Sequence, residues 1–340
     1  MTGELLHVNN LRVSFFSYLG ETKAVRDVSF HVNRGEVLGI VGESGCGKTV
    51  TMLSVMQLLD DAGKIMGGSI RFDNEELTAK SAEEIRKLRG NRMSMIFQDP
   101  FTSLNPVFTV GNQLIEAILS HRKMPRSEAW KRAVQLLKLV EIPSPEERMR
   151  RYPHEMSGGM LQRIMIAMAL SCDPELLIAD EPTTALDVTI QAQILELMKD
   201  LKKRLETAIV IITHDLGVVA DFCDRIIVMY GGQIVEEGTK RGIFYHPLHP
   251  YTKGLLGAVP GPDVKKDEIR LVTIPGAPPD LRNPPAGCAF YPRCRQAMRI
   301  CARMNPNFVE AENQHKVRCW LYSPMNPKRI VEQSLAGEIR

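Results

Sequence analysis

One octapeptide constrains this 340-residue chain more than any other feature. The stretch GESGCGKT, from Gly42 to Thr49, fits the spacing G-x-x-x-x-G-K-[ST]. It follows the apolar run GEVLGIVG, which has the length of a strand, and it precedes KTVTMLSVMQLL, which has a helical pattern. A strand, a glycine-rich turn and a helix in this order predict a loop whose backbone N–H groups point at a phosphate.

Each residue type in this loop has a physical role. The glycines allow backbone conformations that a Cβ atom excludes, so that N–H groups turn inward. Lys48 brings a full positive charge to the β- and γ-phosphates of a nucleotide, and the hydroxyl of Thr49 is expected to ligate Mg²⁺. The expected phosphate-binding residues are Gly42, Glu43, Ser44, Gly45, Cys46, Gly47, Lys48, Thr49 and Val50.

A second acidic element follows another apolar run. In LLIADEP, from Leu176 to Pro182, a strand delivers two carboxylates to its C-terminal end, where open α/β sheets bind ligands. Asp180 is expected to hold Mg²⁺ through water, and Glu181 to poise the attacking water. The alternative interpretation is that these carboxylates only cap the next helix.

The order of apolar runs predicts the fold class. ELLIADEP and TAIVIITHD are strands of the doubly buried kind, and the helical stretch IQAQILELMKDLKKRL lies between them, which favours a parallel α/β sheet. A helical pattern fills residues 110–170. After Pro247, proline and glycine cluster, and we expect a separate C-terminal extension too irregular for a good core of its own.

Composition excludes some classes of function. The net charge of +3 is too small to mark a nucleic-acid binder. No stretch approaches the roughly 20 apolar residues that span a bilayer, and the N-terminal segment lacks the pattern of a signal peptide. We therefore expect a cytosolic protein, whose thiols stay reduced.

Four of the seven cysteines crowd near the C-terminus. They follow the spacing C-x₅-C-x₆-C-x₁₇-C at Cys288, Cys294, Cys301 and Cys319. Clustered thiols in a reducing compartment indicate a metal site. The close C-x₂₋₄-C pairs that structural zinc favours are absent from the spacing, so an iron–sulfur cluster is the preferred interpretation and Zn²⁺ the alternative. The remaining alternative is four unrelated cysteines.

Several further segments resemble the ATPases of ABC transporters. MSGGMLQR, from Met156, resembles their signature segment; IFQDP resembles the Q-loop, TTALD the D-loop and ITHD the switch segment, all in the family's order over roughly residues 5–250. The signature departs from the usual LSGGQ at Met156 and Met160. The residues carried over are Phe15 or Phe16 for adenine, Gln98, Ser157, Gly158, Gly159, Asp187 and His214.

The resemblance implies a fold and a mechanism. The fold is a P-loop NTPase core of α/β class over residues 1–250, with a helical subdomain at about 99–169 and an irregular, cysteine-rich extension over 251–340. Two subunits are expected to face head to tail, with ATP between the phosphate loop of one and the Ser-Gly-Gly of the other. Glu181, His214 and Gln98 take the catalytic roles, while Thr49, Gln98 and Asp180 surround Mg²⁺.

The C-terminal segments HPYTKGLL, PGAPPDL and PPAGCAFYPRC are similar to the extension of ATPases from dipeptide and oligopeptide importers, and TTALDVTIQAQIL resembles their D-type subunit. This implies a [4Fe–4S] cluster on the four cysteines. The implied partners are an F-type ATPase subunit, two permease subunits and an extracellular or periplasmic peptide-binding protein, with no nucleic acid. The implied location is the cytoplasmic face of the cell membrane.

Other functions remain open at this stage. Importers of nickel or glutathione share this type of subunit. A soluble ABC ATPase acting on nucleic acid or ribosomes usually has two cassettes or long coiled-coil insertions, and neither is present in this sequence. A P-loop kinase or GTPase gives the Ser-Gly-Gly and TTALD segments no role.

Overall fold

The computed structural model describes residues 3–183, 187–258, 273–312 and 314–324. Its strands are β1 (Glu4–Ser17), β2 (Gly20–Asn33), β3 (Val37–Val41), β4 (Gly63–Phe72), β5 (Glu75–Glu76), β6 (Met93–Ile96), β7 (Leu176–Asp180), β8 (Ala208–Thr213), β9 (Arg225–Tyr230), β10 (Gln233–Thr239), β11 (Val309–Glu312) and β12 (His315–Val317). Its helices are α1 (Lys48–Val55), α2 (Ala82–Leu88), α3 (Pro100–Ser103), α4 (Val110–Leu119), α5 (Arg126–Leu139), α6 (Pro145–Arg148), α7 (Gly158–Ala169), α8 (Val188–Leu205), α9 (Leu216–Phe222), α10 (Lys240–Tyr245), α11 (Pro250–Gly257) and α12 (Arg299–Arg303).

The main sheet carries the predicted strand–helix alternation. Its order is β11-β12-β10-β9-β3-β8-β7-β6, and the pairs from β9 through β6 are parallel. Strands β3, β7 and β8 are buried along their whole length, which explains why their sequences are continuous apolar runs. The predicted parallel sheet is confirmed, and the carboxyl ends of its strands meet at one edge.

A second, antiparallel sheet lies against the first. Its order is β2-β1-β4-β5. Its long strands β1 and β2 alternate buried apolar residues with exposed polar ones, because one face covers the core and the other meets solvent. Leu38 and Ile40 of β3 belong to the same apolar cluster as Leu6 and Val8 of β1, so the two sheets share one core.

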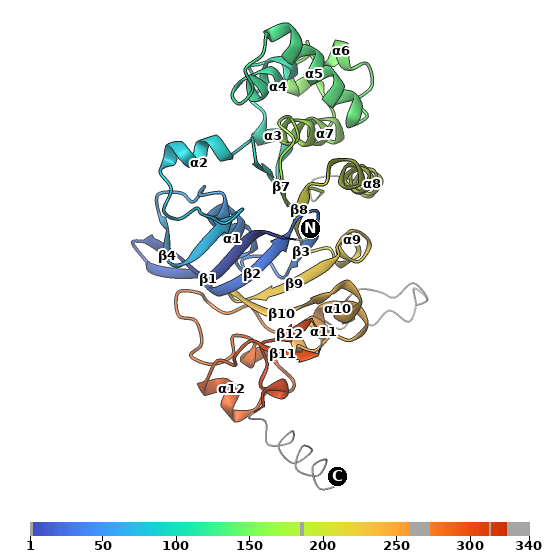
Figure 1. The fold of residues 1–340 in the computed structure, drawn as a ribbon. Coiled ribbons are helices and arrows are strands. Elements are labelled where there is room, and N and C mark those ends of the chain that lie inside the picture. The colour runs from blue at the N-terminus through green and yellow to red at the C-terminus, as the bar shows by residue number, and fades with distance from the viewer. Residues whose placement is uncertain (1–2, 184–186, 259–272, 313, 325–340) are drawn as a thin grey trace.

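The helices α3 to α7 form a subdomain at one end of the molecule, drawn at the top of Figure 1. Local sequence begins these helices. Thr109 caps α4 by accepting a hydrogen bond from the backbone N–H of Asn112, and Ser157 caps α7 in the same way with Met160. The helical pattern predicted for residues 110–170 is confirmed, with a break between α5 and α7.

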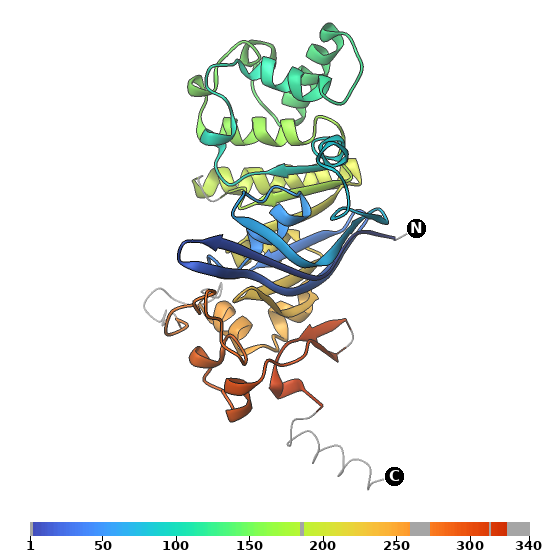
Figure 2. The same ribbon diagram turned by 90° about the vertical axis from the view of Figure 1, so that its left-hand side faces the viewer.

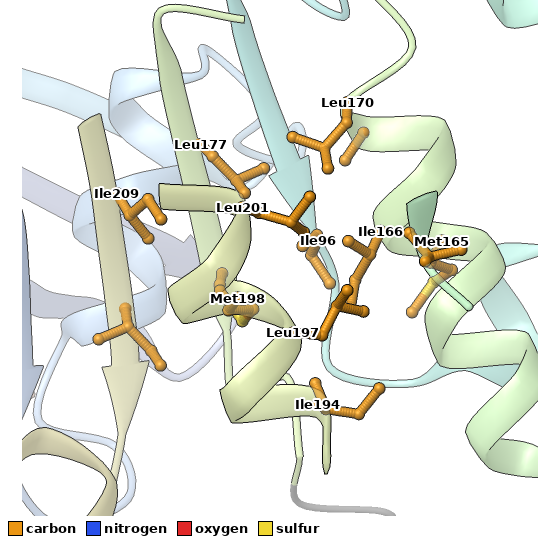
Figure 3. Packing of buried hydrophobic residues seen from close by; sticks show 14 of the residues in the cluster. Ile96, Met165, Ile166, Leu170, Leu177, Ile194, Leu197, Met198, Leu201 and Ile209 are labelled. Atoms are coloured by element: carbon orange, nitrogen blue, oxygen red, sulfur yellow. The ribbon is translucent and has the colours of Figure 1, made fainter. Parts of the chain in front are cut away.

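Helix α8 connects the sheet to this subdomain through its apolar stripe. Ile194, Leu197, Met198 and Leu201 recur at helical spacing and are all buried. Figure 3 shows them between Leu177 and Ile209 of the sheet on one side and, on the other, Met165 and Ile166 of α7 with Leu170 directly after it. The stripe thereby holds α7, whose N-terminus carries the Ser-Gly-Gly segment, in a fixed relation to the sheet.

The described residues from 273 to 324 lie at the end of the molecule opposite the helical subdomain (Figure 2). Strand β12 pairs with β10 in antiparallel fashion, so this segment extends the main sheet. Tyr251 and Phe290 belong to the same core cluster as Tyr230 of β9. The boundary expected after residue 250 stays a prediction, but the residues that follow it pack against the cassette.

Candidate functional site

The glycine-rich loop joins β3 to α1 and has the backbone that the sequence requires. Gly47 has a φ of +101°, and a Cβ atom added there would lie 2.6 Å from the carbonyl oxygen of Ala24. Gly42 has a φ of +154°, and its added Cβ would lie 2.2 Å from the carbonyl oxygen of Met229. Both positions therefore need glycine for close approach of other backbone as well as for conformation.

Lys48 begins α1, directly after the loop, and its side chain curls back over that loop. Its Nζ donates hydrogen bonds to the carbonyl oxygens of Gly42, at 2.8 Å, and Glu43, at 3.1 Å. The residue is only 5 % exposed. An ammonium held inside the loop, beside the N-terminus of α1, gives the site its positive charge.

Thr49 and Asp180 meet across the sheet edge. The hydroxyl of Thr49 donates a 3.0 Å hydrogen bond to Oδ1 of Asp180, at the end of β7. Asp180 is buried, and burial raises the pKa of its carboxyl, while the Thr49 hydroxyl and the charge of Lys48 act in the opposite direction. A threonine hydroxyl and a carboxylate at this distance are the oxygen donors that Mg²⁺ accepts beside nucleotide phosphates.

Glu181 lies at the centre of a small polar group. Its Oε2 accepts a 3.0 Å hydrogen bond from Nε2 of Gln98, and its Oε1 lies 3.4 Å from Nδ1 of His214. Its backbone has a φ of +47° and its N–H donates to the carbonyl oxygen of Ile212, so β8 fixes the turn that presents the side chain. The structure thus brings together the three residues predicted to act in catalysis.

These groups open onto one cleft of about 550 Å³. The lining residues are Ala24, Ser44, Gly45, Cys46, Gly47, Lys48, Thr49, Val50, Gln98, Glu181 and His214. Phe15 and Phe16 are not among the described residues that line it. Phe16 is 42 % exposed, with Nζ of Lys64 at 5.9 Å from its ring centroid, and Phe15 packs against the core. Their role with adenine stays a prediction.

The signature residues lie apart from this cleft. Ser157 is exposed at the N-terminus of α7, with Gly158 and Gly159 in its first turn. A Cβ at Gly159 would lie 2.8 Å from a methyl carbon of Ile190, so α8 passes close to this turn. Asp187 is exposed and precedes α8, while residues 184–186 of the predicted D-loop lie outside the described residues. One chain therefore presents two separate surfaces, a phosphate loop and a Ser-Gly-Gly turn.

The four clustered cysteines line one small pocket of about 20 Å³, together with His249, Phe290 and Trp320 among others. Burial raises the pKa of Cys288 to about 11 and that of Cys319 to about 12. Within residues 3–183, 187–258, 273–312 and 314–324, no group of three or more Cys, His, Asp or Glu side chains is arranged as ligands of one metal ion. The thiols gather as the spacing suggests, but their positions here lend the predicted cluster no support.

Sequence reasoning missed two residues that contact the phosphate loop from the C-terminal segment. Arg293 donates to both carboxylate oxygens of Glu43, at 2.7 and 3.0 Å, and the hydroxyl of Tyr251 accepts from the backbone N–H of Glu43 at 2.9 Å. Glu43 was expected among the phosphate-binding residues, yet its side chain is paired with Arg293. Arg293 directly precedes Cys294, and a lone arginine beside a cysteine motif carries no local signal of this contact.

Comparisons with known proteins were made on the whole chain. The family model for the ABC transporter matches residues 25–184, and the model for the oligopeptide/dipeptide transporter C-terminal region matches residues 235–301. The dipeptide transport ATP-binding protein DppD of Bacillus subtilis is 54% identical over 94% of this chain and 95% of its own length. The chain belongs to the ABC transporter ATPases of this dipeptide/oligopeptide family.

Other relatives and solved structures agree with this membership. The oligopeptide transport ATP-binding protein OppD of Salmonella typhimurium is 53% identical over 92% of each chain. A dimeric ATP-binding cassette solved in a post-hydrolysis state with ADP and Pi is 28% identical, with a TM-score of 0.63, over 70% of this chain and all of its own. CbiO1 from Clostridium perfringens, part of the complex CbiONQ, is 30% identical with a TM-score of 0.61, over 72% and 91% of the two chains.

Family membership shows that the chain is an ATPase of the ABC type, for which ATP and Mg²⁺ are expected, and confirms the predicted cassette fold. It also removes the kinase and GTPase alternatives. None of the helices in the described part of the chain has the length and apolar character needed to cross a membrane.

Proposed function

We propose that this chain hydrolyses ATP to power the import of dipeptides and oligopeptides across the cell membrane. The observation that carries this proposal is that Lys48, Thr49 and Glu181 line one cleft, with Asp180 hydrogen-bonded to Thr49. The chain that holds this cleft is matched over nearly all its length by peptide transport ATP-binding proteins. The match of residues 235–301 to the peptide transporter C-terminal region favours peptides over nickel or glutathione.

At the site, the chain's own groups bind and orient the nucleotide. Lys48 and the loop N–H groups hold the β- and γ-phosphates. Thr49, Gln98 and Asp180 would hold Mg²⁺, and the bound ion would supply charge neutralisation on the phosphate oxygens. Glu181 accepts the proton of the attacking water as general base, and His214, 3.4 Å from it, orients the γ-phosphate and that water.

Nucleotide-dependent pairing follows from the separation of the two binding surfaces. Ser157, Gly158 and Gly159 are not among the residues that line this chain's own cleft, and they supply a hydroxyl, bare N–H groups and a helix N-terminus suited to a γ-phosphate. We assign them, with Asp187, to the nucleotide held by a partner cassette of F type. Loss of the γ-phosphate then removes a contact that only the closed state makes, and the pair reopens.

The test is the variant Glu181→Gln, which keeps the shape of the side chain and removes the base. We expect ATP turnover to fall by about 100-fold or more, and the pair with the F-type partner to persist in MgATP. Glu128→Gln, at an exposed position on α5, is the matched control and should behave as the wild type. Unchanged turnover in Glu181→Gln would remove Glu181 from its role.

The permease is proposed to dock at a groove that contains Phe97, the residue directly before Gln98. The groove has a volume of about 260 Å³ and is lined by residues of β6 and α7, such as Met95 and Met165, together with Phe97 and Leu104. Phe101 lies nearby in α3 and is 60% exposed. Phe101→Ser should detach the ATPase from membranes that contain the two permease subunits, while Tyr245→Ser, on α10, should leave it bound. We propose that the protein works on the cytoplasmic face, where it powers the uptake of solute that a peptide-binding protein delivers to the permease.

A metal on the four cysteines stays a prediction. What supports it is the spacing of the four cysteines and the chemistry of thiolates, which suit an iron–sulfur cluster first and Zn²⁺ second; the geometry of the pocket that they line adds no support. Protein purified without oxygen should then contain about four iron atoms and absorb broadly at about 400 nm. Stoichiometric zinc in a colourless protein, or no metal at all, would contradict the iron assignment.

A further inference from the structure

Glu43 of the phosphate loop is held at three points. Its backbone N–H donates to the Tyr251 hydroxyl at 2.9 Å, and its carbonyl oxygen accepts from Nζ of Lys48 at 3.1 Å. Its two carboxylate oxygens accept hydrogen bonds from the guanidinium of Arg293, at 2.7 and 3.0 Å. A single loop residue thus connects the lysine that meets phosphate with two residues of the C-terminal segment.

Arg293 is itself fixed on every side. Its side chain is 6% exposed and is delivered by a short 3₁₀-helix, Tyr291–Arg293. Its remaining donors bond the carbonyl oxygens of Ile274 and Pro275 and the hydroxyl of Tyr230, at 3.2, 2.9 and 3.2 Å. A planar guanidinium with all its hydrogen bonds made has one orientation, so it can hold Glu43 in one orientation as well.

The charge of Glu43 gives this contact a consequence for nucleotide binding. Glu43 precedes Ser44 and Gly45, which line the cleft, so its carboxylate belongs to the same short loop that must receive several negative phosphate oxygens. An unpaired carboxylate there would repel the phosphates and attract Lys48 away from them, and the low exposure of the site weakens screening by water. Arg293 neutralises that carboxylate and turns it away from the cleft.

We propose that Arg293 is a positioning residue for ATP binding, which acts by neutralising and orienting Glu43 of the phosphate loop. The inference rests on the proposed assignment of this loop to ATP. It gives the C-terminal segment a task at the nucleotide site, in addition to any metal that its cysteines hold.

The test measures the Kd for MgATP by direct binding to the full chain, with the melting temperature recorded for each variant. Arg293→Met should weaken binding about tenfold. In the double variant Glu43→Gln with Arg293→Met, the Kd for MgATP should return to within about threefold of the wild-type value, because no carboxylate is then left unpaired. Arg282→Met, which removes an exposed arginine that forms an ion pair with its near neighbour Asp280, is the matched control and should bind as the wild type.

The outcomes separate this inference from the proposed function. Wild-type protein that fails to bind MgATP would contradict the assignment of the loop itself. Normal binding by Arg293→Met, or a double variant as weak as Arg293→Met alone, would overturn the role of Arg293 while leaving the ATPase assignment intact. If Arg293→Met does not fold, Arg293→Lys replaces it, with an expected weakening of two- to fivefold; a Kd equal to the wild type would overturn the inference.

Discussion

The hydroxyl of Thr49 lies 3.0 Å from Oδ1 of Asp180, and this hydrogen bond joins the first turn of α1 to the end of β7. The two residues are 131 positions apart in the sequence, yet the parallel sheet brings them to one edge. The same edge holds Glu181 and His214, so the oxygens proposed to bind Mg²⁺ and the proposed general base share one edge of the sheet.

The first prediction concerns this pair. Thr49→Ala removes the hydroxyl, and we expect turnover in the assembled transporter to fall about 100-fold at saturating Mg²⁺, because metal-ion stabilisation of phosphoryl transfer contributes several kcal/mol. Thr49→Ser keeps the hydroxyl and should retain turnover within about threefold. Equal loss in both variants would show that the methyl group, and not the oxygen, matters.

The second prediction compares two glycines of the loop. A Cβ at Gly47 would lie 2.6 Å from backbone of Ala24, whereas a Cβ at Gly45 would meet no atom within 4 Å, although both residues have positive φ. Gly47→Ala should therefore abolish MgATP binding, and Gly45→Ala should weaken it by about tenfold or less, from backbone strain alone. A binding assay on folded variants checks the order; the reverse order would mean that the loop has another shape.

The third prediction concerns stability and pH. His249 is 1% exposed, its Nδ1 accepts from the backbone N–H of Tyr251, and burial lowers its pKa to about 4 despite the nearby carboxylate of Glu236. Because the unfolded chain has the ordinary histidine pKa of about 6.5, it takes up the proton first as pH falls. The neutral, buried His249 therefore stabilises the folded state fully above pH 6.5. This stabilisation falls by about 3 kcal/mol as the pH drops from 6.5 to 4.

His249→Asn tests the predicted loss of stability at low pH, since asparagine can still cap the following helix but does not titrate. Denaturant unfolding at pH 7, 5.5 and 4 should show a steeper loss of stability in the wild type than in the variant. Parallel curves would mean that His249 is not the group that titrates.

The fourth prediction concerns the apolar stripe of α8. Leu197→Ala removes a buried side chain between the sheet and α7, and should cost about 2–5 kcal/mol of the free energy of unfolding. Gln193→Ala, at an exposed position of the same helix, should change stability by less than about 0.5 kcal/mol. Since α7 carries Ser157, Leu197→Ala should also weaken nucleotide-dependent pairing at temperatures where the protein is still folded.

Local chemistry explains which parts of this structure could be predicted. The phosphate loop, the strand before it and the helix after it depend on neighbours within a few residues. The buried strands β3, β7 and β8 are predicted by their continuous apolar runs. The convergence of Asp180 and Glu181 with the loop follows from the rule for parallel sheets, so it could be predicted as well.

Contacts made by distant segments could not be predicted in the same way. Arg293 and Glu43 are 250 residues apart, and nothing in the pattern around either residue specifies the other. The pairing of β12 with β10 likewise depends on three residues, His315–Val317, which are too few to carry a strand pattern. Spacing did indicate that the four cysteines belong together, but spacing alone cannot give the distances between their sulfur atoms.

The addition of β12 to the main sheet has one more consequence. Strand β10 is buried along Gln233–Gly238, and β12 covers the row of backbone donors and acceptors on its outer side. A shortened cassette that ended before residue 300 would bare this row and offer a template for pairing with strands of other molecules. We therefore expect the extension to keep the ATPase soluble. Shortened variants should be tested first for aggregation.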